Sequence, residues 1–163
     1  MSAARVALIT AVLLVVLRCP ATADELNKAR SALASLRADL QSGRIAQANI
    51  FSIPYTFFTT FSVTPEYLEV HSRNNKIDVV LSAESVKELI KAIDDTQLDL
   101  YSDVLDLKWG AVFFDASGTR LHSIYLVGRY EPLGPGRGGN IGGINVKLNG
   151  SLIVWFENNF GVR

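Results

Sequence analysis

The chain has 163 residues, of which 48% are hydrophobic, and its 16 basic side chains balance 16 acidic ones. This length predicts one domain of ordinary size with a substantial buried core. Nucleic-acid-binding proteins usually carry an excess of basic over acidic residues. This chain has no such excess, so we expect no nucleic-acid partner.

The first 23 residues have the pattern of a secretory signal peptide. One positive charge at Arg5 precedes an apolar run of twelve residues from Val6 to Leu17, and Ala21-Thr22-Ala23 matches an A-x-A cleavage site. Arg18 ends the run well before the roughly 20 apolar residues that a membrane-spanning helix needs. We therefore expect cleavage after Ala23, export to the periplasm or the exterior, no membrane span after leader removal, and a single mature domain of residues 24–163.

Cysteine chemistry is not expected in the mature protein. Cys19 is the only cysteine and lies in the predicted leader, where Arg18 occupies the place that a small residue would hold in a lipoprotein. The mature chain can then form no disulfide and no cysteine-based zinc site. No cofactor and no metal are predicted.

The first half of the mature chain predicts a helix followed by strands. Residues 24–42 show an apolar stripe with helical spacing. Residues 50–64 alternate between apolar and polar side chains, which predicts a strand with one buried face, and Phe58 is the aromatic residue on its polar face. Strands are also predicted at 68–70 and 77–81. A competing interpretation begins a short helix at Thr64, because Thr-Pro-Glu is also a helix opening.

The second half predicts one helix and four strands. Ser82 is a suitable N-cap for a helix that ends near Asp95. Residues 107–115 and 119–130 predict a long hairpin, and Asn149-Gly150 predicts a second hairpin between strands at 144–148 and 152–156. The predicted fold class is α+β, with a mostly antiparallel sheet of about six or seven strands and two helices packed on one face.

The glycine-rich stretch from Gly134 to Gly143 contains a G-x-G-x-x-G match. That fingerprint binds phosphate only where a strand leads directly into a helix, and an alternating run follows here instead. The stretch therefore predicts a mobile loop between strands that binds no nucleotide. Within it, Arg137 is a candidate for holding an anion or a carboxylate of a partner.

Residues 94–106 carry five carboxylates. Such a cluster could bind calcium or supply the acid and base of a glycosidase, but it lacks the glycine of an EF-hand loop. A solvated connection between helix and hairpin is the favoured interpretation. If residues 98–105 were helical, one face would carry an acidic patch suited to a basic partner, formed by Asp99, Asp103 and Asp106.

No catalytic constellation is recognisable in the sequence. No G-x-S-x-G elbow is present, and the two histidines, His71 and His122, lie far apart in the chain.

The leading hypothesis is a small exported protein that binds another protein or an envelope component, such as an inhibitor, an immunity-type protein or an accessory factor. The alternatives are an exported hydrolase using carboxylates of 94–106 with His122, or a small-ligand carrier with a concave sheet. The oligomeric state is not assigned. The candidate interaction residues are Phe58, Asp99, Asp103, Asp106 and Arg137.

Overall fold

The computed structural model describes residues 19–54, 60–72, 76–101, 104–128 and 136–160. In chain order the elements are α2 (Cys19–Gln41), β1 (Gln47–Ser52), α3 (Pro65–His71), β2 (Ile77–Val80), α4 (Ala83–Asp94), β3 (Gln97–Leu100), β4 (Leu107–Phe114), β5 (Arg120–Val127), β6 (Arg137–Ile141), β7 (Ile144–Asn149) and α5 (Ser151–Phe160). The strands form one seven-stranded sheet in the order β2-β1-β4-β5-β6-β7-β3. Every neighbouring pair is antiparallel, so the predicted α+β class is confirmed.

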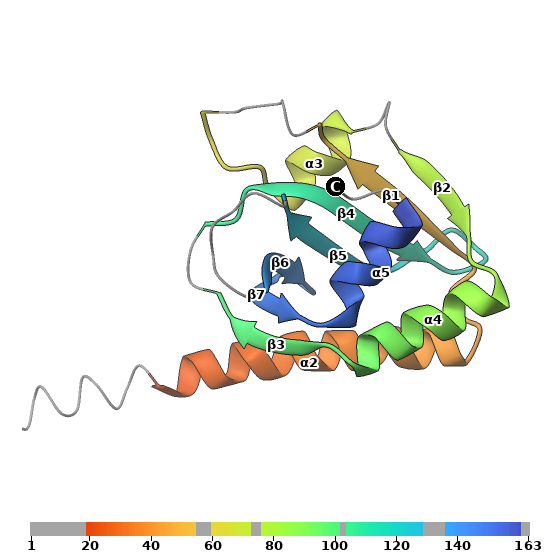
Figure 1. Ribbon diagram of the computed structural model, residues 1–163, viewed down its shortest axis with the longest axis horizontal. Coiled ribbons are helices and arrows are strands. Elements are labelled where there is room, and N and C mark those ends of the chain that lie inside the picture. The colour runs from red at the N-terminus through yellow and green to blue at the C-terminus, as the bar shows by residue number, and fades with distance from the viewer. Residues whose placement is uncertain (1–18, 55–59, 73–75, 102–103, 129–135, 161–163) are drawn as a thin grey trace, which may run out of the picture.

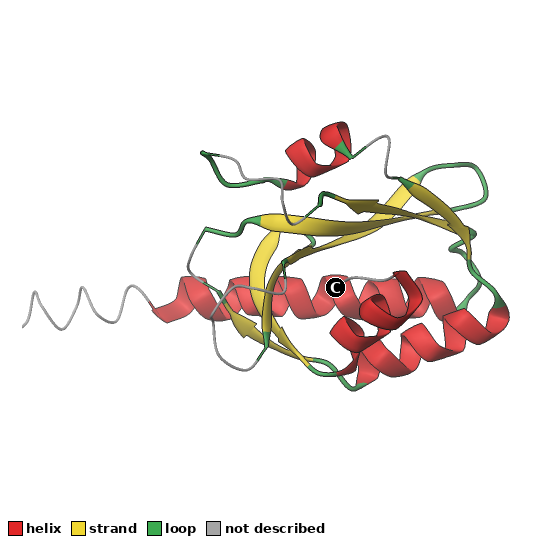
Figure 2. Ribbon diagram, turned by 45° about the horizontal axis from the view of Figure 1, so that its top comes forward, coloured by secondary structure: helices red, strands yellow, loops and turns green. Residues whose placement is uncertain are grey.

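Helices lie on both sides of a curved sheet, with α3 on one side and α2, α4 and α5 on the other (Figures 1 and 2). The larger hydrophobic cluster joins the sheet to α2, α4 and α5, and includes Leu36, Leu89 and Phe156. A smaller cluster on the opposite face contains Leu68 of α3 together with Tyr125 of the sheet. The prediction that two helices cover one face is therefore not confirmed, because three helices contribute to the larger cluster.

The two helices with the clearest sequence signals form where expected. The predicted stripe of α2 is buried at Ala29, Leu33, Leu36 and Leu40. Ser82 caps α4, and its hydroxyl accepts a hydrogen bond of 3.1 Å from the backbone N–H of Ser85.

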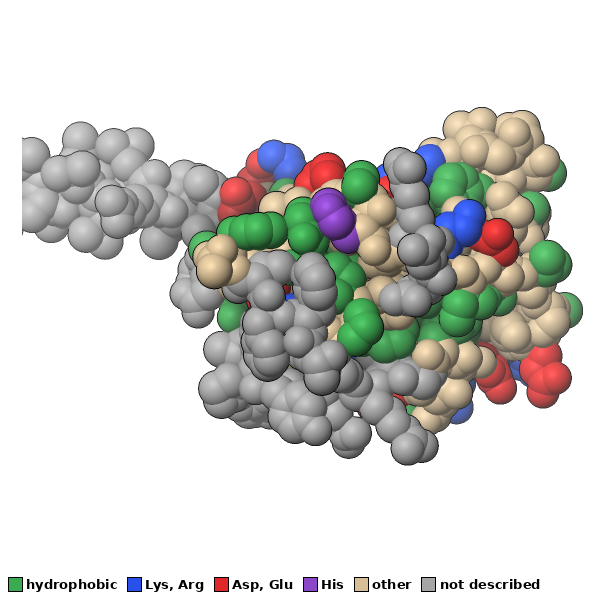
Figure 3. All heavy atoms as spheres, turned by 90° about the horizontal axis from the view of Figure 1, so that it is seen from above, with side chains coloured by type: hydrophobic (Ala, Val, Ile, Leu, Met, Phe, Trp, Pro, Cys, Tyr) green, Lys and Arg blue, Asp and Glu red, His purple; other side chains and the backbone are tan. Residues whose placement is uncertain are grey.

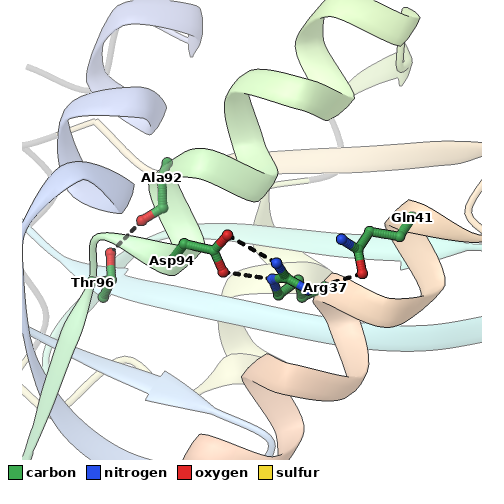
Figure 4. Close-up of polar contacts among 5 residues, drawn as sticks. All are labelled: Arg37, Gln41, Ala92, Asp94 and Thr96. Atoms are coloured by element: carbon green, nitrogen blue, oxygen red, sulfur yellow. Dashed lines mark hydrogen bonds and ion pairs between the residues drawn. The ribbon is translucent and has the colours of Figure 1, made fainter.

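Polar contacts connect α2 and α4 to the elements that follow (Figure 4). The Arg37 guanidinium donates to both carboxylate oxygens of Asp94, at 2.5 Å from Nε and 3.0 Å from Nη2. The Thr96 hydroxyl donates to the Ala92 carbonyl at 2.7 Å and accepts from the Leu152 N–H at 3.2 Å. Thr96 therefore links the end of α4 to the start of α5.

The strand predicted at 68–70 is wrong, and the competing helix is correct. Thr64 adopts an extended backbone and its hydroxyl accepts from the Tyr67 N–H, so it is the N-cap of α3. Pro65 fits the first helical position because it has no N–H to leave unpaired. Helical spacing then buries Leu68 completely and leaves Val70 51% exposed.

The long strand predicted at 50–64 is shorter than expected. β1 ends at Ser52, and Pro54, which has no N–H to donate, follows soon after. The described residues 60–64 form no strand, and Phe61 is 53% exposed instead of lying in the core. β1 also begins earlier than predicted, at Gln47, so the alternating pattern indicated a strand here but gave neither of its bounds.

The glycine-rich stretch is not simply a loop. Arg137–Ile141 forms β6, which pairs with β5 on one side and β7 on the other. Glycine is required at position 139 because neighbouring atoms leave no room for a side chain. A Cβ on Gly139 would lie 2.6 Å from the Tyr125 carbonyl oxygen. A strand, β7, follows the stretch, so it lacks the helix that a dinucleotide fingerprint requires.

The strand predicted at 152–156 is a helix, α5. Leu152, Trp155 and Phe156 are buried and Val154 is 51% exposed. Burial at 152, 155 and 156 is the spacing of one helical face. The apolar residues at 152, 154 and 156 also fit the two-residue period of a strand, which explains the incorrect prediction. Gly150 lies between the last residue of β7 and the first residue of α5. Its φ of 118° is a backbone conformation that favours glycine.

In the described part of the chain, no helix has the length and apolar character needed to cross a bilayer. Residues 1–18 of the predicted leader lie outside the described ranges, and the predicted cleavage site after Ala23 falls within α2. Cleavage and export stay predictions.

Candidate functional site

A cavity of about 370 Å³ lies beside α3, on the face of the sheet opposite α5. Its wall includes Glu66, Glu69 and Val70 of α3, Arg120 and Tyr125 of β5, and Asn140 of β6. Side chains from a helix and two strands therefore converge on one space. This is the usual construction of a binding site, in which a few polar groups are fixed around a concavity.

Three polar side chains form a connected cluster in this wall. The Tyr125 hydroxyl donates to the Glu69 carboxylate, and Arg120 Nη1 lies 3.0 and 3.1 Å from the two oxygens of that carboxylate. Arg120 Nη2 also donates to the Tyr125 oxygen at 2.6 Å. Each member thus contacts the other two, and the cluster connects α3 to β5.

The position of Tyr125 depends on a glycine in the neighbouring strand. A Cβ on Gly110 would lie 2.7 Å from Tyr125 Cδ1, so the absence of a side chain at this position allows the ring to lie against β4. Burial, followed by the hydrogen bond to Glu69, raises the pKa of the Tyr125 phenol to about 12. The phenol therefore stays protonated at physiological pH and acts as a hydrogen-bond donor to Glu69, not as a base.

Glu66 adds a second carboxylate to the cavity. Hydrogen bonds from its own backbone N–H and from the Thr64 hydroxyl, with a smaller effect of Arg120, lower the pKa of its carboxyl. Its place in the first turn of α3 favours the same charged form. Two carboxylates therefore face one guanidinium, which gives the described part of the cavity wall a net negative charge.

The outer surface of α3 carries an aromatic stack beside this cavity. The Tyr67 ring stacks on His71 with 3.8 Å between ring centroids and meets Phe61 edge-on at 5.0 Å. Val70 lies between this stack and the cavity and is 51% exposed. Figure 3 shows the molecule from this side, where hydrophobic side chains lie interspersed with charged and other polar ones. We call the set Phe61, Glu66, Tyr67, Val70 and His71 the α3 surface.

The residues proposed from the sequence do not form one site. Phe58 and Asp103 lie outside the described residues. Asp99 is exposed on β3, at an edge of the sheet, beside a second cavity of about 490 Å³ between α2 and β3. Because residues 97–100 are a strand, the helical face proposed for the acidic segment does not form.

Asp106 and Arg137 both have intramolecular partners. Asp106 accepts from the Val63 N–H at 3.2 Å and pairs with Lys108 at 2.9 Å. The Arg137 side chain is only 10% exposed, and its Nη2 lies 2.5 Å from Glu157 of α5. The prediction of an accessible anion-binding arginine in a loop is wrong, since Arg137 lies in β6 and already binds a carboxylate of its own chain.

His122 is not paired with a carboxylate of the acidic segment. Its Nε2 lies 2.7 Å from Asp39 of α2, and this hydrogen bond is the largest cause lowering the pKa of the Asp39 carboxyl. In β4, the residue opposite His122 is Phe113, seven positions after Asp106. At about 3.3 Å per strand residue, this places Asp106 roughly 20 Å away along the strand. Asp106 and His122 therefore do not form a catalytic pair.

Among the described residues, no group of three or more histidine, cysteine, aspartate or glutamate side chains is arranged to hold a metal ion. Comparison of the chain with protein-family models, with characterised proteins and with solved structures finds no significant match. The site is therefore interpreted from its own geometry.

The sequence contains one local signal for this site, the Thr-Pro-Glu helix opening at Thr64. A helix beginning after Thr64 puts Glu66 and Val70 four residues apart on one exposed face, with Tyr67 and His71 beside them. In a strand, Tyr67 and His71 would lie on the face opposite Glu66 and Val70. No local pattern indicates that Arg120 and Tyr125 meet Glu69, since they lie 51 and 56 positions away from it.

Proposed function

We propose that this protein is a binding protein whose α3 surface docks on another protein. The observation that carries the proposal is the Phe61–Tyr67–His71 stack, in which Phe61 and His71 are exposed and Tyr67 is partly buried, with Val70 and a polar cavity beside it. Protein interfaces are enriched in aromatic residues at their centres, with polar groups at the rim. The α3 surface has the same arrangement on a small scale.

The rigidity of α3 supports this function. Leu68 is fully buried beneath the helix, and the Glu69–Arg120–Tyr125 cluster attaches one side of it to the sheet. A surface that is held in place before binding loses less conformational entropy when a partner docks. As in the sequence analysis, we propose that the protein is exported and acts as an inhibitor, an immunity-type protein or an envelope accessory factor.

Two matched substitutions to a neutral polar residue test the proposal, Val70→Asn and Val154→Asn. Both valines are 51% exposed on helices, but only Val70 belongs to the α3 surface. We expect Val70→Asn to reduce recovery of a partner about tenfold or more, the loss expected at an interface hot spot, and Val154→Asn to leave it unchanged.

The measurement is affinity purification of the tagged full chain from mildly cross-linked cells that naturally produce it, with the co-purified protein quantified. Circular dichroism melts serve as the folding control for both variants. Recovery of the same partner in equal amounts with both variants, or of none with the unmodified protein, would contradict the proposal.

A further inference from the structure

We propose that the cavity beside α3 receives a cationic side chain, a lysine or an arginine, from the docked partner. This inference rests on the proposed function and names the chemistry that the partner presents. Among the described residues, the cavity wall holds the Glu66 and Glu69 carboxylates and one cation, Arg120. An incoming anion would meet two like charges, whereas a cation restores neutrality.

The internal contacts of the cluster leave Glu66 as the group that attracts the ligand. Arg120 is held by Glu69 and by the Tyr125 hydroxyl, and the Tyr125 proton is donated to Glu69. Glu66 is exposed and lies at the cavity wall in the first turn of α3. An ammonium or guanidinium group entering the cavity can pair with Glu66 without displacing Arg120.

The size and edges of the cavity suit a single side chain. A volume of about 370 Å³ is at the small end of ligand pockets, which favours one side chain over a large organic ligand. Val70 lies in the same wall and is half exposed, so it can pack against the methylene stem of a lysine or arginine. A bound lysine or arginine needs apolar contact for its stem and a carboxylate for its charged end, and Val70 and Glu66 supply these.

The test titrates the full chain with three small probes, monitored by NMR shifts of backbone amides. The probes are Nα-acetyl-arginine amide, Nα-acetyl-lysine amide and Nα-acetyl-citrulline amide, the last being a neutral analogue of arginine. We expect one or both cationic probes to bind about fivefold more tightly than citrulline, the effect of a partly exposed ion pair, and to shift amides at Glu66 and Ser123. Tighter binding of only one cationic probe would identify the preferred cation.

Glu66→Gln and Glu84→Gln are the matched variants. Glu84 occupies the same position after the N-cap of α4 as Glu66 does after the N-cap of α3, and both side chains are exposed. Glu66→Gln should reduce binding of the cationic probes to the citrulline level, whereas Glu84→Gln should not. Equal binding of all three probes, or unchanged binding in Glu66→Gln, would overturn the inference. The Val70→Asn and Val154→Asn pair introduces no charge and measures recovery of the whole partner, so failure of the inference and failure of the proposed function are distinguishable.

Discussion

Gly139→Ala should destabilise the domain by about 1–3 kcal/mol or more, the usual cost of inserting a methyl group into a packed region. The added Cβ would lie 2.6 Å from the Tyr125 carbonyl oxygen and 2.7 Å from Leu148 Cδ1. The first of these atoms belongs to the backbone of β5, which pairs with β6 and cannot move without disturbing the sheet. Equilibrium urea unfolding, with the free energy extrapolated to water, measures the effect.

Gly138→Ala is the matched control in the same strand. Its Cβ would come closest to Leu105 Cδ2, at 2.8 Å, and the end of a leucine side chain can rotate away. The loss should therefore be clearly smaller than at Gly139. If both variants stayed within about 0.5 kcal/mol of the unmodified protein, as surface substitutions usually do, residues 137–141 would not form a central strand.

Leu68→Ala should cost about 2–5 kcal/mol, whereas Val70→Ala should cost about 0.5 kcal/mol or less. Leu68 is fully buried in the cluster between α3 and the sheet, and Val70 is 51% exposed. Truncating Leu68 leaves a cavity beneath the helix, but truncating Val70 removes atoms that largely face solvent. The same urea titrations measure both variants.

This pair also separates the helix from the strand interpretation of 68–70. In a strand, residues 68 and 70 point to the same face, so both truncations would have similar effects. Similar losses of stability would therefore contradict the helical α3 and, with it, the α3 surface.

The parts of the fold that were predicted correctly are those that local chemistry determines. The apolar stripe of α2 and the Ser82 cap of α4 are properties of neighbouring residues. The β4–β5 hairpin is equally local: Asp115 accepts hydrogen bonds from the Ser117 and Thr119 N–H groups, and Gly118 has a φ of 82°. Short-range signals of this kind can be read without knowledge of the tertiary structure.

β6 and α5 could not be assigned correctly from such signals. Gly138 and Gly139 have no side chains, so β6 has no alternating pattern, and Gly139 is required by atoms of the neighbouring strands β5 and β7. In α5, Leu152 and Phe156 fit both a two-residue and a helical period. The packing of Trp155, which is 7% exposed, against the same core agrees only with the helix.

The candidate site was predictable only in part, for the same reason. Glu66 and Val70 belong to one short helix whose N-terminal signal is visible in the sequence. Their cavity exists because β5 brings Arg120 and Tyr125 against α3, and because Gly110 leaves space for the tyrosine ring. These are long-range contacts, so the acidic segment at 94–106 is the more prominent feature of the sequence, although none of its described residues lines this cavity.

The central claim is that the α3 surface contacts another protein, and site-specific photo-cross-linking in the producing cells tests it most directly. The photoreactive residue p-benzoylphenylalanine is placed at position 70 in one sample and at position 154 in another, where the native valines are equally exposed. The account predicts a covalent adduct with a defined protein from position 70 and none from position 154. No adduct from position 70, or the same adduct from both positions, would contradict it.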